Sequence, residues 1–325
     1  MQMRRGTNPS KINQSTVAPP PLITICFIVH IPNLKGYYRQ SLRILKLCID
    51  SVVTNTFNMN EIVIYDNGSC KRVIYFLRKL LKKKKIHFLF MSEKNMGKIG
   101  AWNMLFTAAR GEFVVYADSD VYFYPSWDVE HLKVFQEFEN VGMVTGLPVR
   151  EKSEFFTKNT LVEIMKIPNV LVEKGKFIKD EFLRDFRTSL GKNPLDYYSG
   201  DLKSLIDLRV TKNNFQCFIG ASHFQFMSKN YVLRSLFPLE FSKAIGEEKI
   251  LDKKIDEMKL LRLSTLERHV QHVGNNLYGD IWFENLNLQN SNLFTYFKLK
   301  LIRKIIRLYG YSVKLIRTFR PSVKR

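Results

Sequence analysis

Four short apolar runs alternate with helix-like segments between residues 22 and 117, and this alternation constrains the fold more than any other feature. The runs are rich in β-branched and aromatic residues, which is typical of strands buried on both faces. The intervening segments repeat apolar residues at helical spacing. This order predicts a parallel sheet with right-handed crossovers. The predicted strands are 22–29, 61–65, 86–91 and 113–117, and the predicted helices are 41–53, 73–81 and 97–110.

The pattern is less regular after residue 117. A helix is predicted over 127–138 and a strand near 142–145. The charged stretch 151–215 is interpreted as mostly helical, and the aromatic run 215–227 as strand-like. The length suits one large domain or two small ones, either of which buries a full core.

Positive charge gathers at the two ends of the chain. The 325 residues include 51 Lys and Arg against 30 Asp and Glu, a net charge of +21. Residues 1–60 hold seven of these bases and one acid, residues 285–325 hold ten bases and no acid, and residues 61–284 hold the other 34 bases and 29 acids. The body of the protein is therefore only mildly basic, whereas a nucleic-acid binder often carries a basic stripe through its fold. We expect no nucleic-acid partner.

The segment 298–309 (KLKLIRKIIRLY) places apolar residues on one helical face and basic residues on the other. This pattern is typical of a helix that lies in the interface of an anionic membrane, and we expect peripheral membrane contact. A terminal helix that docks on its own protein shows the same pattern, so that interpretation also stands. The run Lys82–Lys85 is interpreted as a solvated helix end, favoured by the helix dipole.

The four cysteines form no CxxC pair and are too few for a disulfide framework. This favours reduced thiols and a cytoplasmic protein. The longest apolar run, 22–31, is shorter than the roughly 18 residues of a membrane span. Its polar, Pro-rich lead also argues against a signal peptide. We expect a cytoplasmic location, at the inner face of the plasma membrane if the basic C-terminal segment binds lipid.

Polar residues stand where the predicted parallel strands end, which is where ligands bind in such sheets. These positions are His30, Asp66-Asn67-Gly68-Ser69, Ser92–Asn95 and Asp118-Ser119-Asp120. Alternation along the strand predicts that Asp118 and Asp120 share one face. Two convergent carboxylates suit Mg²⁺ or Mn²⁺. The tetrapeptide at 66–69 also has the composition of a plain turn.

Two nucleotide-binding classes are disfavoured by missing motifs. No GxGxxG follows the first strand, and the sequence contains no GxxxxGK[ST]. The chain is therefore unlike a dinucleotide-binding Rossmann enzyme or a P-loop NTPase.

An ordered set of segments resembles family 2 glycosyltransferases of the GT-A fold. The matching segments are TICFIVH, IVIYDNGS, EKNMGKIGAWN, GEFVVYADSDVYF, GEEKILD and VQHVGN. The resemblance covers 22–150 well and 215–280 more loosely. It implies an α/β nucleotide-diphospho-sugar transferase fold, with a Rossmann-like mixed sheet flanked by helices and a helical C-terminal extension.

The domain boundaries follow from this resemblance together with the composition. We predict a flexible tail over 1–21 and a transferase domain over 22–285, followed by a basic amphipathic helix over 286–325. Within the transferase domain, 22–150 is the expected donor-binding half and 151–285 the expected acceptor half.

The resemblance also implies roles for the donor and metal residues. Asp118-Ser119-Asp120 resembles the family's DXD motif, in which the second Asp binds a divalent ion, Mn²⁺ or Mg²⁺, and the first lies near the ribose and the metal. His272 matches a late His that completes the metal shell in some members, although an ordinary structural His fits the position almost as well. The implied donor-binding residues are His30, Asp66, Asn95, Gly97, Lys98 and Asp118.

The implied catalytic base lies in the acidic pair Glu247-Glu248, which is commonly Glu-Asp in the family. Glu248 is one methylene longer than Asp, and Asp252 is a third candidate. The implied reaction moves a sugar, with inversion, from a UDP- or GDP-type donor to a hydroxyl of a glycan or lipid-linked acceptor. His223 lies where acceptor contacts often fall in the family.

Two other functions remain open. A sugar-phosphate nucleotidyltransferase usually carries a Gly-rich loop after the first strand, but HIPNLKGYYRQ holds one glycine there. A non-catalytic module for nucleic acid or anionic lipid leaves Asp118, Asp120 and the pair Glu247-Glu248 without a purpose. A transferase that binds its donor without turnover is also compatible with the sequence.

Overall fold

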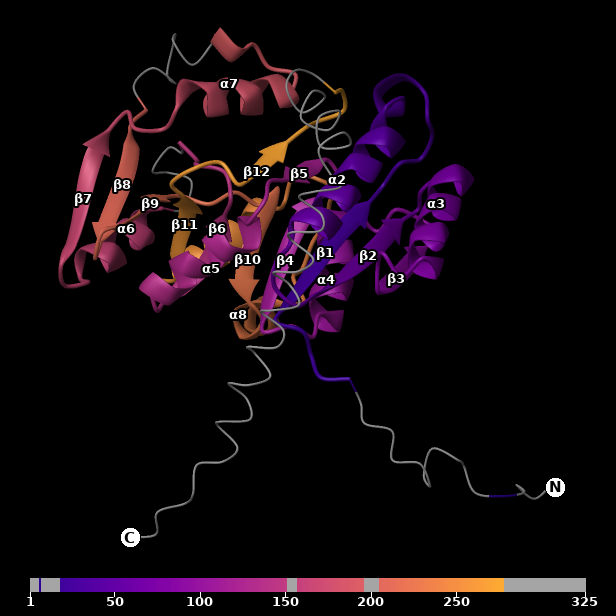
Figure 1. Cartoon of the computed structure of the whole chain (residues 1–325), viewed down its shortest axis with the longest axis horizontal. Coiled ribbons are helices and arrows are strands. Elements are labelled where there is room, and N and C mark those ends of the chain that lie inside the picture. The colour runs from indigo at the N-terminus through magenta and orange to yellow at the C-terminus, as the bar shows by residue number, and fades with distance from the viewer. Residues whose placement is uncertain (1–5, 7–17, 151–156, 196–204, 278–325) are drawn as a thin grey trace, which may run out of the picture.

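The structure, a computed structural model, describes residues 6, 18–150, 157–195 and 205–277 (Figure 1). Within these ranges the strands form a ten-stranded sheet and a separate two-stranded sheet. In chain order, the large sheet contains β1 (Ile23–Val29), β2 (Asn60–Asn67), β3 (Phe88–Ser92), β4 (Phe113–Asp118), β6 (Val141–Thr145), β7 (Val170–Gly175), β8 (Asp207–Lys212), β9 (Phe215–Ile219), β10 (Gln225–Lys229) and β11 (Leu261–Thr265). The small sheet pairs β5 (Val121–Phe123) with β12 (Val270–His272).

Helices cover both faces of the large sheet. In chain order they are the short 3-10 helix η1 (Gly36–Tyr38), α2 (Ser41–Asn55), α3 (Lys71–Lys82), α4 (Gly97–Ala108), α5 (Trp127–Glu137), α6 (Lys158–Met165), α7 (Asp180–Ser189), α8 (Asn230–Leu236) and α9 (Lys249–Glu257). One hydrophobic cluster joins the sheet to α2, α3 and α5, and a second joins its other face to α4, α8 and α9. None of the helices in the described ranges has the length and hydropathy of a membrane-spanning segment.

The predicted parallel half of the sheet is confirmed. The strand order begins β3-β2-β1-β4, and each neighbouring pair in this group is parallel. Val29 pairs with Asp66 and Ile28 with Asp118, so the carboxyl ends of β1, β2 and β4 meet at one edge of the sheet. The polar residues at these strand ends are thereby brought together.

The other half makes the sheet mixed, as predicted. The strand β10 is antiparallel to both β4 and β6, β11 is parallel to β6, and β9, β8 and β7 continue antiparallel to the edge. The Rossmann-like mixed sheet with flanking helices is therefore confirmed. The domain boundaries stay a prediction, and the expected C-terminal helix lies outside the described residues.

One detail differs from the sequence-based prediction. The stretch 151–215 was expected to be mostly helical, but it contributes the edge strand β7 and its neighbour β8. Their charges resemble those of a surface helix because edge strands expose charged side chains, and Arg209 pairs across the strands with Glu173 at 3.0 Å. The strand-like run 215–227 is divided between two strands, β9 and β10, and β10 continues to Lys229.

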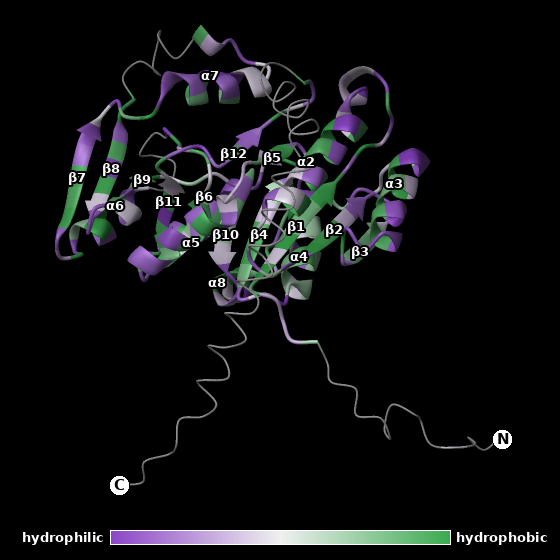
Figure 2. Ribbon diagram, viewed as in Figure 1, coloured by the Kyte–Doolittle hydropathy of each residue, from purple (hydrophilic) through white to green (hydrophobic). Residues whose placement is uncertain are grey.

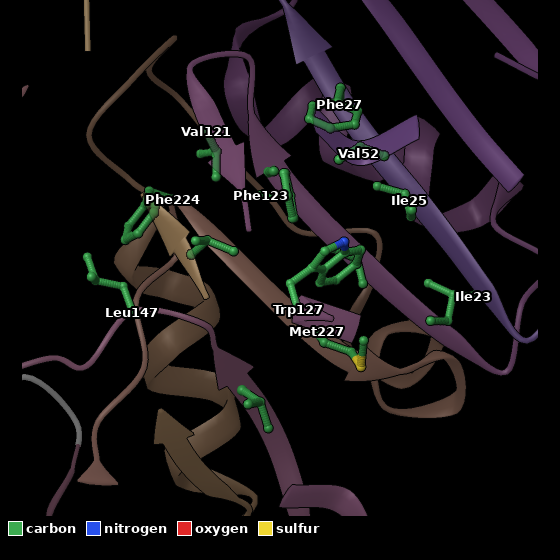
Figure 3. Close-up of a cluster of buried hydrophobic side chains, with 14 of the residues drawn as sticks. Ile23, Ile25, Phe27, Val52, Val121, Phe123, Trp127, Leu147, Phe224 and Met227 are labelled. Atoms are coloured by element: carbon green, nitrogen blue, oxygen red, sulfur yellow. The ribbon is translucent and has the colours of Figure 1, made fainter. Parts of the chain in front are cut away.

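Aromatic and aliphatic side chains from distant segments fill the core on the α2–α5 side. Figure 3 shows Phe27 of β1, Phe123 of β5, Trp127 of α5 and Met227 of β10 in one cluster. The Trp127 indole nitrogen also donates to Thr56 Oγ1 at 3.1 Å, so its polar atom is satisfied. Each such side chain contributes about 1.5–3 kcal/mol on burial, which holds β1, β5, α5 and β10 together.

A buried histidine makes stability depend on pH. The side chain of His131 is fully buried in α5, and burial lowers its pKa from 6.5 to about 4. The unfolded chain takes up this proton as pH falls through about 6.5, whereas the folded chain resists it down to about pH 4. The folded state therefore loses about 3 kcal/mol across this window.

We expect the urea midpoint of unfolding to fall steeply between pH 6.5 and pH 4. A His131→Gln variant should show a shallower pH dependence, because it has no imidazole to titrate. An equally steep profile in the variant contradicts the assignment to His131.

Candidate active site

A cleft of about 660 Å³ opens at the carboxyl ends of β1 and β4. Its walls also come from η1, the start of α2, the end of α7, the loop before α9 and β12. Figure 1 shows α7 and β12 on the same side of the sheet, over these strand ends. The sequence-predicted site residues that line the cleft are His30, Asn95, Lys98, Asp118, Asp120, Glu248 and His272. Asp66, Gly97 and Glu247 are not among the lining residues.

Asp118 is the last residue of β4 and is already charge-balanced. Its carboxylate oxygens lie 2.7 and 3.0 Å from Lys98 Nζ, and it accepts a hydrogen bond from the Tyr116 hydroxyl. Burial, and then the charge of Asp118, raise the pKa of Tyr116 well above its usual range, so Tyr116 remains a donor. The Lys98 ammonium also lies 5.3 and 5.5 Å from the ring centres of Tyr116 and Trp102.

Asp120 lies in the turn between β4 and β5, and not on the strand itself. The two carboxylates of the Asp118–Asp120 pair line the same cleft but have different partners. Asp120 Oδ2 faces His272 Nε2 at 3.4 Å. Burial raises the pKa of Asp120. Positive charge on His272 lowers this pKa, the charge of Asp118 raises it further, and the charge of Lys98 lowers it.

A hydrogen-bond chain sets the tautomer of His272. The Ser189 hydroxyl donates to the Phe186 carbonyl at 2.7 Å, so its oxygen accepts from His272 Nδ1–H at 2.8 Å. When the imidazole is neutral, its Nε2 atom is an acceptor that faces the Asp120 carboxylate. Two acceptors held face to face are a favourable site for a cation. Sequence reasoning missed Ser189, because it lies in a stretch without a recognisable motif.

Few side chains in this region can act as ligands of a cation. Within the described residues, no group of three or more His, Cys, Asp or Glu side chains forms a metal cluster. Mg²⁺ is usually bound by one or two carboxylates, several waters and substrate phosphates, so Asp120 and His272 fit an ion that a phosphate ligand completes. The residues present therefore fit a divalent ion shared with a ligand.

Asp66 is fully buried at the end of β2, and neither of its carboxylate oxygens has a hydrogen-bond partner within the described part of the chain. Burial raises the pKa of Asp66, against the opposing effects of Ser69 and His30. A buried carboxylate without partners is costly, so this position favours a ligand that supplies donors.

Asn67 connects the ends of three segments. Its amide nitrogen donates to Asn95 Oδ1 at 2.9 Å, its side-chain oxygen accepts from the Met96 backbone N–H at 2.7 Å, and its carbonyl accepts from His30 Nδ1 at 2.8 Å. These bonds fix His30 and Asn95 at the cleft. Sequence reasoning assigned Asn67 only to a turn, and its place directly after Asp66 was the available signal.

The three candidate bases have distinct environments. Glu248 is 8% exposed, lines the cleft and accepts one hydrogen bond, from the Gly246 backbone at 2.9 Å. Glu247 accepts from the Ser242 and Lys243 backbone N–H groups and from the Ser242 hydroxyl, at 2.8 to 2.9 Å. These bonds, the Lys243 and Ser242 backbone groups first, lower the pKa of Glu247. Glu247 therefore holds the loop that contains Ser242 and Lys243.

The loop that Glu247 holds is pressed against the start of α4. The Ala244 carbonyl accepts from the Lys98 backbone N–H at 2.9 Å. Gly97 has a φ of +73°, and a Cβ there would lie 3.0 Å from Ala244 Cα, so only glycine suits this approach. The loop thus fixes Glu248 relative to Lys98.

The third carboxylate, Asp252, is 5% exposed and ion-paired. Its Oδ2 lies 3.0 Å from His223 Nδ1 and its Oδ1 lies 3.2 Å from the fully buried Arg262. Asp252 is not among the cleft-lining residues, and neither is His223. The expected C-terminal amphipathic segment, 298–309, lies outside the described residues.

Residues 37–193 match the sequence profile of the family described as Glycosyl transferase family 2. The match contains Asp66, Lys98, Asp118 and Asp120, whereas Glu248 and His272 lie beyond it. An uncharacterized glycosyltransferase of Nostoc sp. (strain PCC 7120) is 32% identical over 107 residues, which is 33% of each chain. The chain thus spans about a third of that relative's length.

Solved structures of similar shape cover more of the chain at low identity. A mannosyltransferase from Pyrobaculum calidifontis, solved with GDP-Man and Mn²⁺, is 15% identical over 76% of this chain and 56% of its own, with a TM-score of 0.45. GalNAc-T7, solved with UDP, GalNAc and Mn²⁺, is 13% identical over 78% and 43%, with a TM-score of 0.48. The chain covers about half of these proteins.

Proposed function

Because the chain belongs to glycosyltransferase family 2 through residues 37–193, we propose that it transfers a sugar from a nucleotide-diphosphate donor to an acceptor hydroxyl. The observation that carries the proposal is the convergence of unlike groups in one cleft. A cation, Lys98, and a cation-binding pair, Asp120 and His272, line the same space as the carboxylate of Glu248. These are the groups that such a displacement requires.

Asp120 and His272 are the residues proposed to hold a divalent ion, Mn²⁺ or Mg²⁺. Such an ion, when bound, neutralises charge that gathers on a departing diphosphate. Ser189 keeps His272 Nε2 free for this role through its bond to Nδ1. Asp118 is proposed to orient Lys98 toward the donor.

The donor is proposed to lie along the ends of β1, β2 and β4. Asp66 is the candidate for hydrogen bonds from the base or ribose, because its buried oxygens lack partners within the described residues. Asn67 holds His30 and Asn95 beside this position. A UDP- or GDP-type donor suits these groups.

Glu248 is the proposed catalytic base. It accepts the proton of the acceptor hydroxyl, whose oxygen attacks the anomeric carbon as the bond to the diphosphate breaks. A single in-line displacement of this kind inverts the anomeric centre. Glu247, whose oxygens are occupied by its own loop, is proposed to position Glu248.

The acceptor is proposed to be a glycan or a lipid-linked sugar, at the cytoplasmic face of an anionic membrane. The support is compositional, because residues 285–325 carry ten bases and no acid. Anionic leaflets attract such segments.

A nucleotide panel tests the donor proposal. Thermal unfolding of the full chain is measured with UDP, GDP, CDP and dTDP, each with and without Mn²⁺. Ligand at a hundredfold excess over its Kd adds about 2.7 kcal/mol to the folded state. We expect one nucleotide to raise the Tm only with Mn²⁺, and Asp120→Ala to abolish that rise.

The control is Asp50→Ala, which removes an exposed carboxylate of α2 that pairs with Lys85 on the surface. It should retain the nucleotide response. A well-folded wild type that responds to none of the four nucleotides contradicts the proposed function.

A further inference from the structure

The outward sides of α2 and α3 form one continuous surface, here named the α2–α3 face. Two contacts join the helices: Lys85, just after α3, pairs with Asp50 of α2 at 2.8 Å, and Lys46 of α2 lies 5.5 Å from the ring centre of Phe76 in α3. Both helices cover the same side of the sheet. The proposed transferase chemistry does not use this face.

The α2–α3 face is almost uniformly positive. Residues 31–92 contain twelve Lys and Arg against three acids. Two of these acids, Glu61 and Asp66, are buried in the sheet, so Asp50 is the exposed one. All twelve bases are exposed. Seven lie on the two helices (Arg43, Lys46, Lys71, Arg72, Arg78, Lys79 and Lys82), two lie before α2 (Lys35 and Arg39), and three follow α3 directly (Lys83, Lys84 and Lys85). A face with this imbalance attracts an anionic partner.

An exposed aromatic side chain lies within these charges. Lys71, Tyr75, Arg78 and Lys82 follow one another at helical spacing along the outer side of α3, opposite its buried residues. The Tyr75 side chain is 70% exposed. Figure 2 shows hydrophilic and hydrophobic residues alternating along α3. The outer row therefore combines cations with a ring that is apolar on its faces and polar at its tip.

We propose that the α2–α3 face binds the surface of an anionic lipid bilayer. Lys and Arg are attracted to anionic head groups, and Tyr favours the membrane interface because one end of its ring is apolar and the other polar. Two adjacent helices offer a broad surface rather than a groove, which suits a bilayer better than a single polyanionic strand. This inference is independent of the transferase proposal.

The geometry places the cleft beside the bound surface. Ser41 and Ile44, at the start of α2, line the cleft, as do Tyr37 and Tyr38 just before it. Arg39 and Arg43 are exposed on the same segment. A bilayer on the α2–α3 face therefore lies next to the cleft mouth, where a lipid-linked acceptor would arrive.

Vesicle binding of matched charge variants tests the proposal. The full chain is titrated with vesicles of equal parts phosphatidylglycerol and phosphatidylcholine, and with phosphatidylcholine alone. Replacing Arg78, Lys82 and Lys83 by Gln should weaken binding to the anionic vesicles by about a hundredfold, at roughly 1 kcal/mol for each charge. The control replaces Lys158, Lys174 and Lys176 by Gln, three exposed charges on α6 and at the opposite edge of the sheet.

The two triple variants have equal net charge, so any contribution of the basic C-terminal segment is the same in both. Equal affinities for anionic vesicles overturn the proposal. A preferential loss of binding to double-stranded RNA with unchanged vesicle binding also overturns it, in favour of a nucleic-acid face. Unchanged urea midpoints establish that both variants fold.

A second measurement locates the contact. Tyr75→Trp introduces a fluorophore into the outer row of α3, and the increase in fluorescence over wild type reports on that position alone. We expect brominated lipids in anionic vesicles to quench this added fluorescence by more than half. Absence of quenching under conditions of full binding overturns the proposal.

Discussion

Replacing Glu248 by Gln should lower kcat by about 10²- to 10⁴-fold, the range that a positioned general base contributes. Gln is nearly isosteric and its amide oxygen still accepts from Gly246 N–H, so the loop before α9 keeps its shape. Only the ability to take the acceptor proton is lost. Donor affinity, measured as the metal-dependent nucleotide shift in Tm, should remain within a few-fold of wild type.

Glu247 supplies a matched control on the adjacent residue. In Glu247→Gln the amide oxygen still accepts from the Ser242 and Lys243 backbone groups, and the amide nitrogen can donate to the Ser242 hydroxyl. This variant loses a charge but keeps its loop, so kcat should change by less than about tenfold. The reverse pattern, with Glu247→Gln inactive and Glu248→Gln active, contradicts the assignment of the base.

The sequence predicted the parallel half of the fold well, because local periodicity and tertiary environment agree there. The strand 22–29 is almost wholly apolar because both of its faces are covered, by α2 on one side and α4 on the other. This agreement is absent in the edge strand β7 and its neighbour β8, because their half-exposed, charged residues follow no period that separates them from a helix. Neither length nor composition showed that β10 inserts antiparallel between β4 and β6.

For the cleft, spacing identified residue types, and only the family resemblance assigned Asp120 and His272 to one metal site. Asp118 and Asp120 were expected to act as a pair on one strand face. In the structure both line the same cleft but have different partners: β4 ends at Asp118, and Asp120 in the following turn faces His272, 152 positions later in the chain. Spacing cannot reveal a contact between residues so far apart. For the same reason Ser189, which fixes the His272 tautomer, had no signal in the sequence.

The half-buried His223 and the buried Asp252 and Arg262 illustrate the limits of a motif. Asp252 was a reasonable third candidate for the base, since it lies one helical turn after Glu248. Its charge is instead matched by the buried Arg262 and bonded to His223. Removing one partner of a buried pair typically costs about 3–5 kcal/mol, so loss of activity in an Asp252 variant would reflect folding as readily as catalysis. Activity measurements at this position therefore need a stability control.

Lys98 is the second residue whose substitution we expect to lower kcat strongly. It is anchored through its backbone to Ala244, its ammonium is held by Asp118, and its side chain is 17% exposed at the cleft. When a diphosphate binds beside this ammonium, it replaces Asp118 as the anionic partner of Lys98, and the Lys98 side chain needs little rearrangement. Lys98→Met keeps the length and apolar contacts with Trp102 but removes the charge, so kcat should fall by about 10²- to 10³-fold, as for other preorganised electrostatic groups.

The control is Lys94→Met on the exposed loop before α4, which should retain wild-type turnover. If the Lys98 and Lys94 variants turn over equally, the positive charge at Lys98 serves only to balance Asp118, and the donor phosphates bind elsewhere in the cleft.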